Sequence, residues 1–160
     1  MDRYVKNETT GAADTAPVFE SQKEFSGTAP TSSAVSASFH AGSASCFSLS
    51  VRVLGREITA YVILPDEGIH VTVCGGEKSH IGAVSVVDPD GARHDMQFPT
   101  HKDGVIASEW ADALHQAGYC PVVAEAGIHY DDLSKEGIAA VVDAADQLLA
   151  QVLRKLPDHH

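Results

Sequence analysis

Long apolar runs and an excess of basic residues are both missing from this 160-residue sequence. No run approaches the roughly 18–20 apolar residues of a transmembrane helix, and the first residues contain no apolar segment of the signal-peptide type. Lys and Arg number 11 against 22 Asp and Glu, which gives a formal net charge of −11. This balance argues against a nucleic-acid partner and against an anionic membrane surface. We therefore predict a cytoplasmic protein that binds neither.

Cysteine is also scarce, with three residues spread along the chain and no CxxC pair. A disulfide framework is not expected in a cytosolic protein, so we interpret Cys46, Cys74 and Cys120 as small buried apolar residues. Cys74, which directly precedes Gly75-Gly76, stays open as a candidate nucleophile. The P-loop, GxGxxG, GxSxG and HExxH motifs are missing too. Their absence argues against nucleotide hydrolysis, Rossmann redox chemistry and zinc-protease action.

The composition is that of one globular domain preceded by a tail. Apolar residues make up 44% of the chain and charged residues 21%, so a core can form. Residues 1–38 are rich in Ser, Thr, Ala and Gly and have no sustained period. We predict a flexible N-terminal tail over 1–38 and a single α+β ligand-binding domain over 39–160.

Alternating side chains predict strands in the first half of that domain. Residues 46–53 alternate apolar and polar side chains with period two. Turn signals follow at Gly55-Arg56, at 65–68 and at 88–91, and they separate further short apolar segments. A short strand is also expected at 119–123. The pattern predicts an antiparallel meander of about five to six strands.

The C-terminal third is predicted to be helical. One helix is expected over 103–117, with Gly118 as its C-terminal stop. A second carries apolar residues at spacings of three and four from Ile138 to Leu156, with Ser134 or Asp132 as its N-cap. Strands followed by helices predict an α+β fold with both helices packed on one face of the sheet.

Three short segments join glycine to histidine at the ends of predicted elements. The first, residues 75–84, contains a glycine pair that can present backbone N–H groups to an anion, together with Lys78 and His80. The second contains His101 and Lys102 at the start of the first helix, where N–H groups attract phosphates and carboxylates. The third contains His129 ahead of the second helix. Their joint occurrence predicts a site for a small anionic ligand.

Other residues have plainer interpretations. A histidine beside a glycine is usually an ordinary loop residue, so each of the three segments is a weak signal alone. We interpret the remaining histidines as surface residues, and Trp110 as part of the core or of an interface.

Residues 73–84, 101–103 and 126–131 together resemble the prenylated-flavin chaperone family, which is LpdD-like. Its members are small accessory proteins of UbiD-type, prenylated-FMN-dependent aromatic acid decarboxylases and of their flavin prenyltransferase. The similarity covers about residues 47–156, and Ser79 stands where the family often has proline. The resemblance implies a carrier without enzymatic activity, which binds prenylated FMN and delivers it to the decarboxylase as a chaperone or maturation factor.

The resemblance also implies which residues bind the flavin. Amides near the glycine pair and the His101-Lys102 helix start would hold the phosphate, while His80 and His129 would contact the flavin edge. With few aromatic residues available, the ring would lie between aliphatic walls or across a homodimer interface. The complete predicted set is Gly75, Gly76, Lys78, His80, Ile81, Gly82, His101, Lys102 and His129.

Two other classes of function stay open at this stage. His80, His101 and His129 are also candidate ligands of a divalent metal, with a position left for water or substrate, which would make the chain a metal-dependent enzyme. Metal and flavin binding together are compatible as well. In the second alternative the chain is a non-catalytic subunit of the decarboxylase with no ligand of its own.

Overall fold

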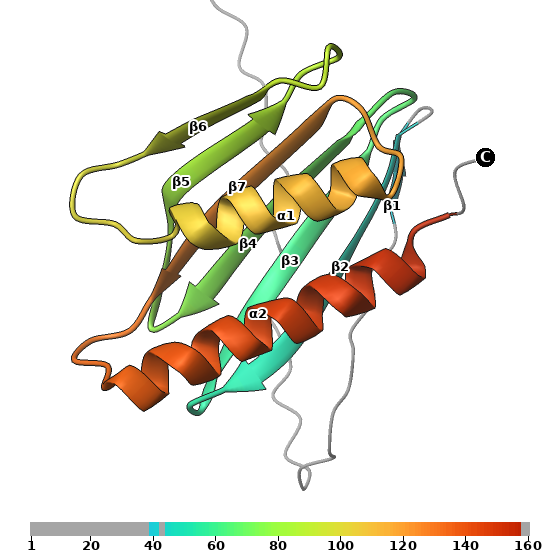
Figure 1. Cartoon of the computed structure of the whole chain (residues 1–160). Coiled ribbons are helices and arrows are strands. Elements are labelled where there is room, and N and C mark those ends of the chain that lie inside the picture. The colour runs from blue at the N-terminus through green and yellow to red at the C-terminus, as the bar shows by residue number, and fades with distance from the viewer. Residues whose placement is uncertain (1–38, 42–43, 158–160) are drawn as a thin grey trace, which may run out of the picture. The chain divides into compact units, whose positions relative to one another are not determined.

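A computed structural model describes residues 39–41 and 44–157 (Figure 1). The predicted tail, residues 1–38, lies outside the described residues. Along the chain the elements are β1 (Phe39–Ala41), β2 (Ala44–Val53), β3 (Arg56–Leu64), β4 (Ile69–Gly76), β5 (Lys78–Val87), β6 (Arg93–Gln97), α1 (Gly104–Gln116), β7 (Val122–His129) and α2 (Lys135–Lys155). Within the described residues, neither helix is long and apolar enough to cross a bilayer.

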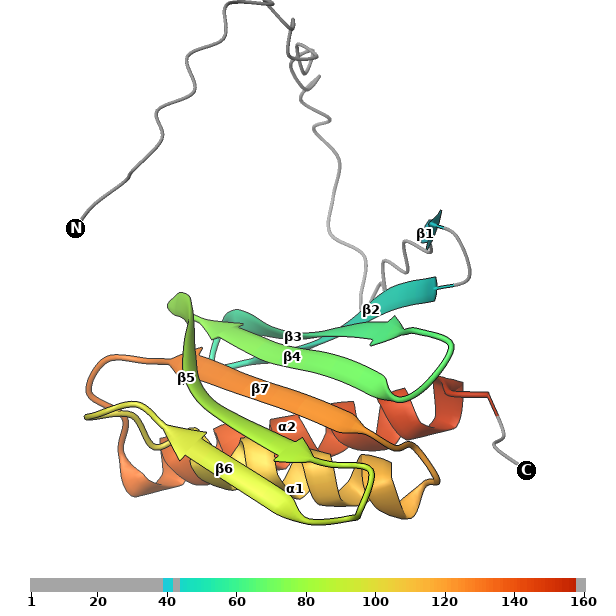
Figure 2. The same ribbon diagram turned by 90° about the horizontal axis from the view of Figure 1, so that it is seen from above.

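The described strands form one seven-stranded sheet in the order β1-β2-β3-β4-β7-β5-β6. The β4–β7 pair is parallel, and the other neighbouring pairs are antiparallel. Both helices cover the same face of this sheet (Figure 2). The predicted α+β class, a mostly antiparallel sheet with two helices on one face, is confirmed.

The strand order corrects the predicted meander of five or six strands. β7 lies between β4 and β5, so the two strands that flank Glu77 are separated by a segment that follows α1. His129, at the end of β7, pairs with Gly76 on one side and with Lys78 on the other. The Glu77 N–H donates to the His129 carbonyl at 2.7 Å. The turn between β4 and β5 therefore passes directly over the end of β7.

The core lies between the sheet and the two helices. α1 packs against β5 and β7, and α2 packs against β2 and β3. The predicted apolar stripe of α2 is largely buried from Val141 onward, including Leu148 and Val152 at 0% exposure. Its first member, Ile138, is 48% exposed. Trp110 of α1 is buried, which agrees with its interpretation as part of the core.

The Ser134 side chain caps α2, one of the two predicted caps. Its hydroxyl accepts the Gly137 N–H at 3.1 Å. We expect Ser134→Ala to lower the free energy of unfolding by about 1 kcal/mol, because the substitution leaves a first-turn amide without its acceptor. Urea unfolding will measure the loss. Ser134→Asp, which keeps an acceptor oxygen, should retain most of the stability, and equal losses in both variants would contradict the capping role.

The three cysteines are only partly buried, which corrects their interpretation as buried apolar residues. Cys74 alternates along β4 with the buried Val71 and Val73, so its side chain lies on the sheet face away from the helices. The alternation explains the difference: a small residue within an apolar strand can point to either face.

Candidate functional site

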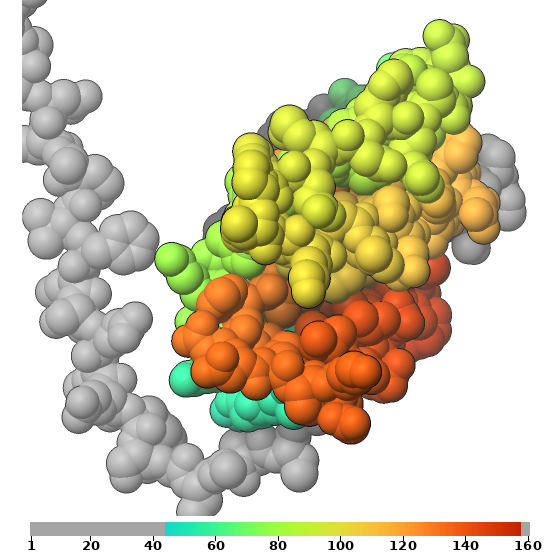
Figure 3. Space-filling model, turned by 60° about the vertical axis from the view of Figure 1, so that its left-hand side comes forward, coloured from blue at the N-terminus to red at the C-terminus, as the bar shows by residue number. Residues whose placement is uncertain are grey.

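A cavity of about 450 Å³ lies where β7 ends and where α1 and α2 begin. Figure 3 shows the surface near this end, where the segment around residue 100 (yellow) lies beside the segment around residue 130 (orange). Seven lining residues carry polar groups: His80, Thr100, His101, Lys102, Asp103, His129 and Tyr130. The other seven are aliphatic: Val105, Ile106, Ile128, Leu133, Ile138, Val141 and Val142. The cavity thus combines a polar end with an apolar wall, which is the usual character of a small-molecule site.

His80 reaches the cavity from an irregular part of β5. β5 pairs with β7 at Lys78 and Ser79 and again from Ala83 onward, and the register shifts between these points. Such a bulge bends a strand and redirects a side chain. Gly127 of β7 makes room for it, because a Cβ at that position would lie 1.8 Å from the His80 carbonyl oxygen.

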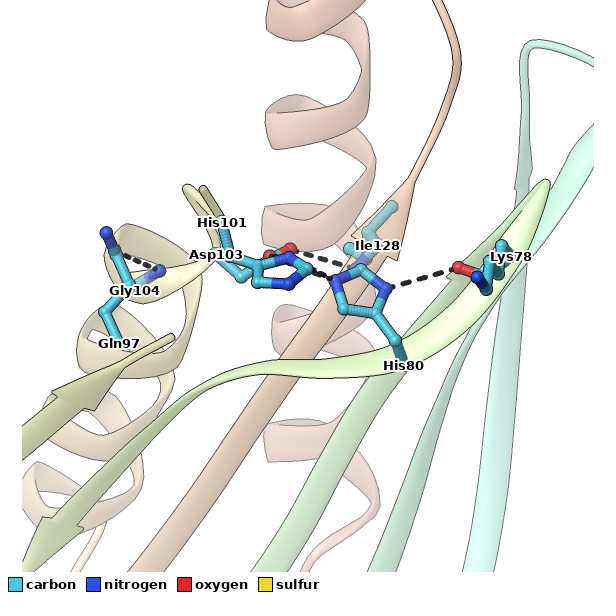
Figure 4. A network of polar contacts seen from close by, with 7 residues as sticks. All are labelled: Lys78, His80, Gln97, His101, Asp103, Gly104 and Ile128. Carbon is cyan, nitrogen blue, oxygen red and sulfur yellow. Dashed lines mark hydrogen bonds and ion pairs between the residues drawn. The ribbon is translucent and has the colours of Figure 1, made fainter. Parts of the chain in front are cut away.

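Three side chains form a compact polar group, here called the His–His–Asp cluster: His80, His101 and Asp103 (Figure 4). His80 Nε2 lies 2.9 Å from His101 Nδ1 and 3.4 Å from Asp103 Oδ2. His101 Nδ1 lies 3.8 Å from the same Asp103 oxygen. The side chains of Asp103 and His80 are 9% and 17% exposed, whereas that of His101 is 34% exposed, so the cluster is shielded from water except at His101.

Asp103 occupies the N-cap position of α1, but its side chain makes no capping hydrogen bond. Its Oδ1 instead accepts the Ile128 N–H at 2.9 Å, which ties the start of α1 to the end of β7. The Gly104 N–H donates to Gln97 Oε1 at 3.2 Å. Gln97 therefore satisfies one first-turn amide of α1 in place of Asp103. The positive end of the helix dipole still favours an anionic group here, and Lys102 in the cavity lining adds a positive charge.

His129 and Tyr130 complete the polar end. The His129 ring meets that of His80 edge-on, with centroids 6.1 Å apart, and its Nε2 lies 2.9 Å from Asp131 Oδ1. The Tyr130 hydroxyl donates to the Val53 carbonyl at 2.9 Å. Burial raises the pKa of the Tyr130 phenol, with a smaller opposing effect from Arg56, so the phenol stays neutral around neutral pH. Its ring can therefore serve as part of the cavity wall.

The structure brings four of the nine predicted binding residues into the cavity lining: His80, His101, Lys102 and His129. Gly75 and Gly76 are the last two residues of β4. A Cβ at either glycine would lie 2.2 Å from a backbone oxygen of a neighbouring segment, so close packing accounts for both. Lys78, Ile81 and Gly82 belong to β5 and do not line the cavity. Flavin contacts by these five residues stay a prediction.

Two features of the site were missed from the sequence. Asp103 was interpreted only as the start of a helix, although its position two residues after His101 is a signal for a shared site. Aliphatic walls were expected, but the residues that form them were not identified. The available signal was that the α2 stripe begins at Ile138, earlier than burial against the sheet requires.

Comparison with known proteins identifies the family to which this fold and cavity belong. The family described as the prenylated flavin chaperone LpdD-like domain matches residues 53–157. The match includes every residue that lines the cavity. The chain belongs to the LpdD-like prenylated-flavin chaperone family. The resemblance predicted from the three glycine–histidine segments is thereby confirmed.

A relative within the LpdD-like family is Protein LpdD of Lactiplantibacillus plantarum. It is 31% identical to this chain over 112 residues, which cover 66% of this chain and 81% of the relative. Membership in the LpdD-like family supports a chaperone or maturation role in the prenylated-FMN system of UbiD-type decarboxylases. It also favours an accessory role over catalysis.

Proposed function

We propose that the chain binds prenylated FMN in the cavity and delivers it to a UbiD-type decarboxylase. The observation that carries this proposal is the cavity itself, in a member of this family: one end is polar and basic, and the wall is aliphatic. Its volume of about 450 Å³ falls within the range of roughly 300–1,000 Å³ typical of small-molecule sites.

The two halves of the cavity suit the two halves of the ligand. We place the phosphate at the start of α1 beside Lys102, and the flavin ring along the aliphatic residues of α1 and α2. The imidazole rings of His80 and His129 line the polar end of the cavity, where the polar edge of the flavin would be bound. Such a site has few polar anchors and no covalent attachment, which suits a carrier that must release its ligand.

The opening of the cavity also suits transfer. Val105 and Ile138 in its lining are 58% and 48% exposed, so the apolar wall continues to the surface. A ligand held there can pass to a partner without unfolding the domain. We include in the proposal that the flavin comes from a flavin prenyltransferase.

The proposal also includes a homodimer. The sheet face away from the helices exposes Tyr61 at 52% and Ile63 at 43%, which are large apolar side chains for a free surface. Native mass spectrometry of the chain will measure its oligomeric state.

Co-expression with a flavin prenyltransferase, followed by anaerobic purification, tests flavin binding. We expect a flavin absorbance spectrum and a native mass that corresponds to one prenylated FMN per chain. His80→Ala and Lys102→Ala should retain at least tenfold less flavin. Each variant removes a polar anchor, and a hydrogen bond to a charged group is worth about 1.5–3 kcal/mol. Apo-decarboxylase activation by the loaded protein then tests delivery.

Two substitutions make the test specific. Arg154→Ala removes one positive charge at the far end of α2 and should retain the flavin. Lys78→Ala should also retain the flavin, because Lys78 does not line the cavity. Loss of flavin from this variant would instead favour a phosphate bound at the glycine pair. A chain that copurifies with the decarboxylase but carries no flavin would overturn the proposal in favour of a non-catalytic subunit.

A further inference from the structure

The His–His–Asp cluster has the composition of a metal site. It presents two imidazole nitrogens and one carboxylate oxygen, contributed by β5 and by the segment that leads into α1. The three atoms, His80 Nε2, His101 Nδ1 and Asp103 Oδ2, all lie within 4.8 Å of one another. The set differs from the predicted trio of histidines, because Asp103 stands in place of His129.

The separations fit a single small cation. Two ligands bound about 2.1 Å from a tetrahedral Zn²⁺ lie about 3.4 Å apart. The observed separations of 2.9, 3.4 and 3.8 Å bracket this value. A cation can therefore be bound through small side-chain adjustments, without movement of the backbone.

Contacts behind the ligand atoms hold them in place. Asp103 Oδ1 accepts the Ile128 N–H, which leaves Oδ2 directed at the histidines. His80 Nδ1 lies 3.4 Å from the Lys78 carbonyl oxygen, a group that only accepts, and this contact leaves the lone pair on Nε2. Metal-binding imidazoles and carboxylates are commonly oriented in this way by their second polar atom.

Gly82 is required by the same arrangement. A Cβ there would lie 2.1 Å from Asp103 Oδ2 and 3.0 Å from His80 Nε2, in the space between two of the ligand atoms. The absence of a side chain at this position is therefore what allows the carboxylate and the imidazole to approach each other.

We propose that His80, His101 and Asp103 bind one divalent transition-metal ion, with an open coordination position toward the cavity. Mixed imidazole and carboxylate ligands suit Zn²⁺, Fe²⁺ and Mn²⁺, whereas Mg²⁺ and Ca²⁺ prefer oxygen ligands alone. All three ligand residues line the cavity, so a ligand in the cavity can reach the ion. The inference goes beyond flavin transport, because it concerns a second ligand that this site binds by itself.

The test uses the full chain without an affinity tag and without flavin. Zn²⁺ titration by calorimetry, and Co²⁺ titration followed by visible absorbance, will give the stoichiometry and the coordination. We expect one ion per chain and a higher midpoint of thermal unfolding in excess Zn²⁺, because an ion that binds only the folded state stabilises it.

Variants locate the ion. Asp103→Asn keeps an acceptor for the Ile128 N–H but loses the anionic ligand, and His101→Ala removes a ligand from a partly exposed side chain; each should weaken binding at least tenfold. His129→Ala and His94→Ala should bind like the unchanged chain. Absence of stoichiometric binding by the unchanged chain would overturn the proposal. So would Asp103→Asn and His101→Ala variants that bind Zn²⁺ as tightly as the unchanged chain. A loss in His129→Ala as large as that in Asp103→Asn would overturn this ligand set.

Because the titration contains no flavin, its outcome is independent of the proposed carrier function. A chain that binds Zn²⁺ but retains no prenylated FMN would overturn only the carrier function. A chain that retains the flavin but gives no Zn²⁺ stoichiometry would overturn only the metal site.

Discussion

Trp110→Ala will lower the free energy of unfolding by about 3–5 kcal/mol, as is usual when a buried aromatic side chain is truncated. Trp110 is 1% exposed and lies on the face of α1 that packs against β5 and β7. Loss of the indole would leave a void between helix and sheet that strand pairing prevents from collapsing. Because Trp110 is the only tryptophan of the chain, far-UV circular dichroism, not fluorescence, must follow the urea unfolding.

Trp110→Phe is the matched control, and its effect should be much smaller. Among the described residues, the indole Nε1 is buried and has no hydrogen-bond partner. Removing this unpaired N–H offsets part of the packing lost with the smaller ring, so we expect a loss below about 2 kcal/mol. Similar losses in the two variants would contradict the view that volume, and not the N–H group, explains the role of Trp110.

Gly127→Ala will disturb both the stability and the site. The added Cβ would lie 1.8 Å from the His80 carbonyl oxygen and 2.5 Å from the carbonyl carbon. Both atoms belong to the backbone, so no side-chain rotation relieves the contact and β5 must move away from β7. Overpacking of this kind costs about 1–3 kcal/mol. Urea unfolding will measure the cost, and NMR signals of the His80 and His101 rings will report the displacement.

Gly137→Ala is the control for this substitution. A Cβ at Gly137 would lie 3.0 Å from the end of the flexible Leu133 side chain and 3.7 Å from Leu133 Cβ and Ser134 Oγ, which is ordinary contact distance. Because alanine favours helix over glycine by up to about 1 kcal/mol, this variant should be as stable as the unchanged chain or more stable. Unchanged histidine signals in Gly127→Ala would show that the bulge does not position His80.

Local sequence patterns predicted the elements that depend on local chemistry. The α2 stripe and the Ser134 cap follow from helical periodicity and from the need of first-turn amides for an acceptor. His101 and His129 were each predicted at the end of an element, and the fold brings both into the lining of one cavity. Spacing along the chain carries this information, because strand and helix lengths determine where an element ends.

Contacts between segments distant in the sequence determined the features that local patterns did not predict. The full length of β7 was missed because Ala124, Glu125 and Ala126 are poor strand formers, and pairing with β4 and β5 holds them extended. The bulge at His80 has no local signal, since it depends on Gly127 of another strand. The Asp103 carboxylate likewise turns from its own helix to the Ile128 amide, a choice that only the folded neighbourhood sets.

The placement of β7 between β4 and β5 has a consequence for synthesis of the chain. Until residue 129 has left the ribosome, β4 and β5 each have an edge whose N–H and C=O groups await a strand that is not yet made. Open edges of this kind promote pairing with other chains, and the long sequence separation slows correct closure. We therefore expect nascent chains that end before β7 to aggregate or to recruit cellular holdases, and full-length chains to escape both.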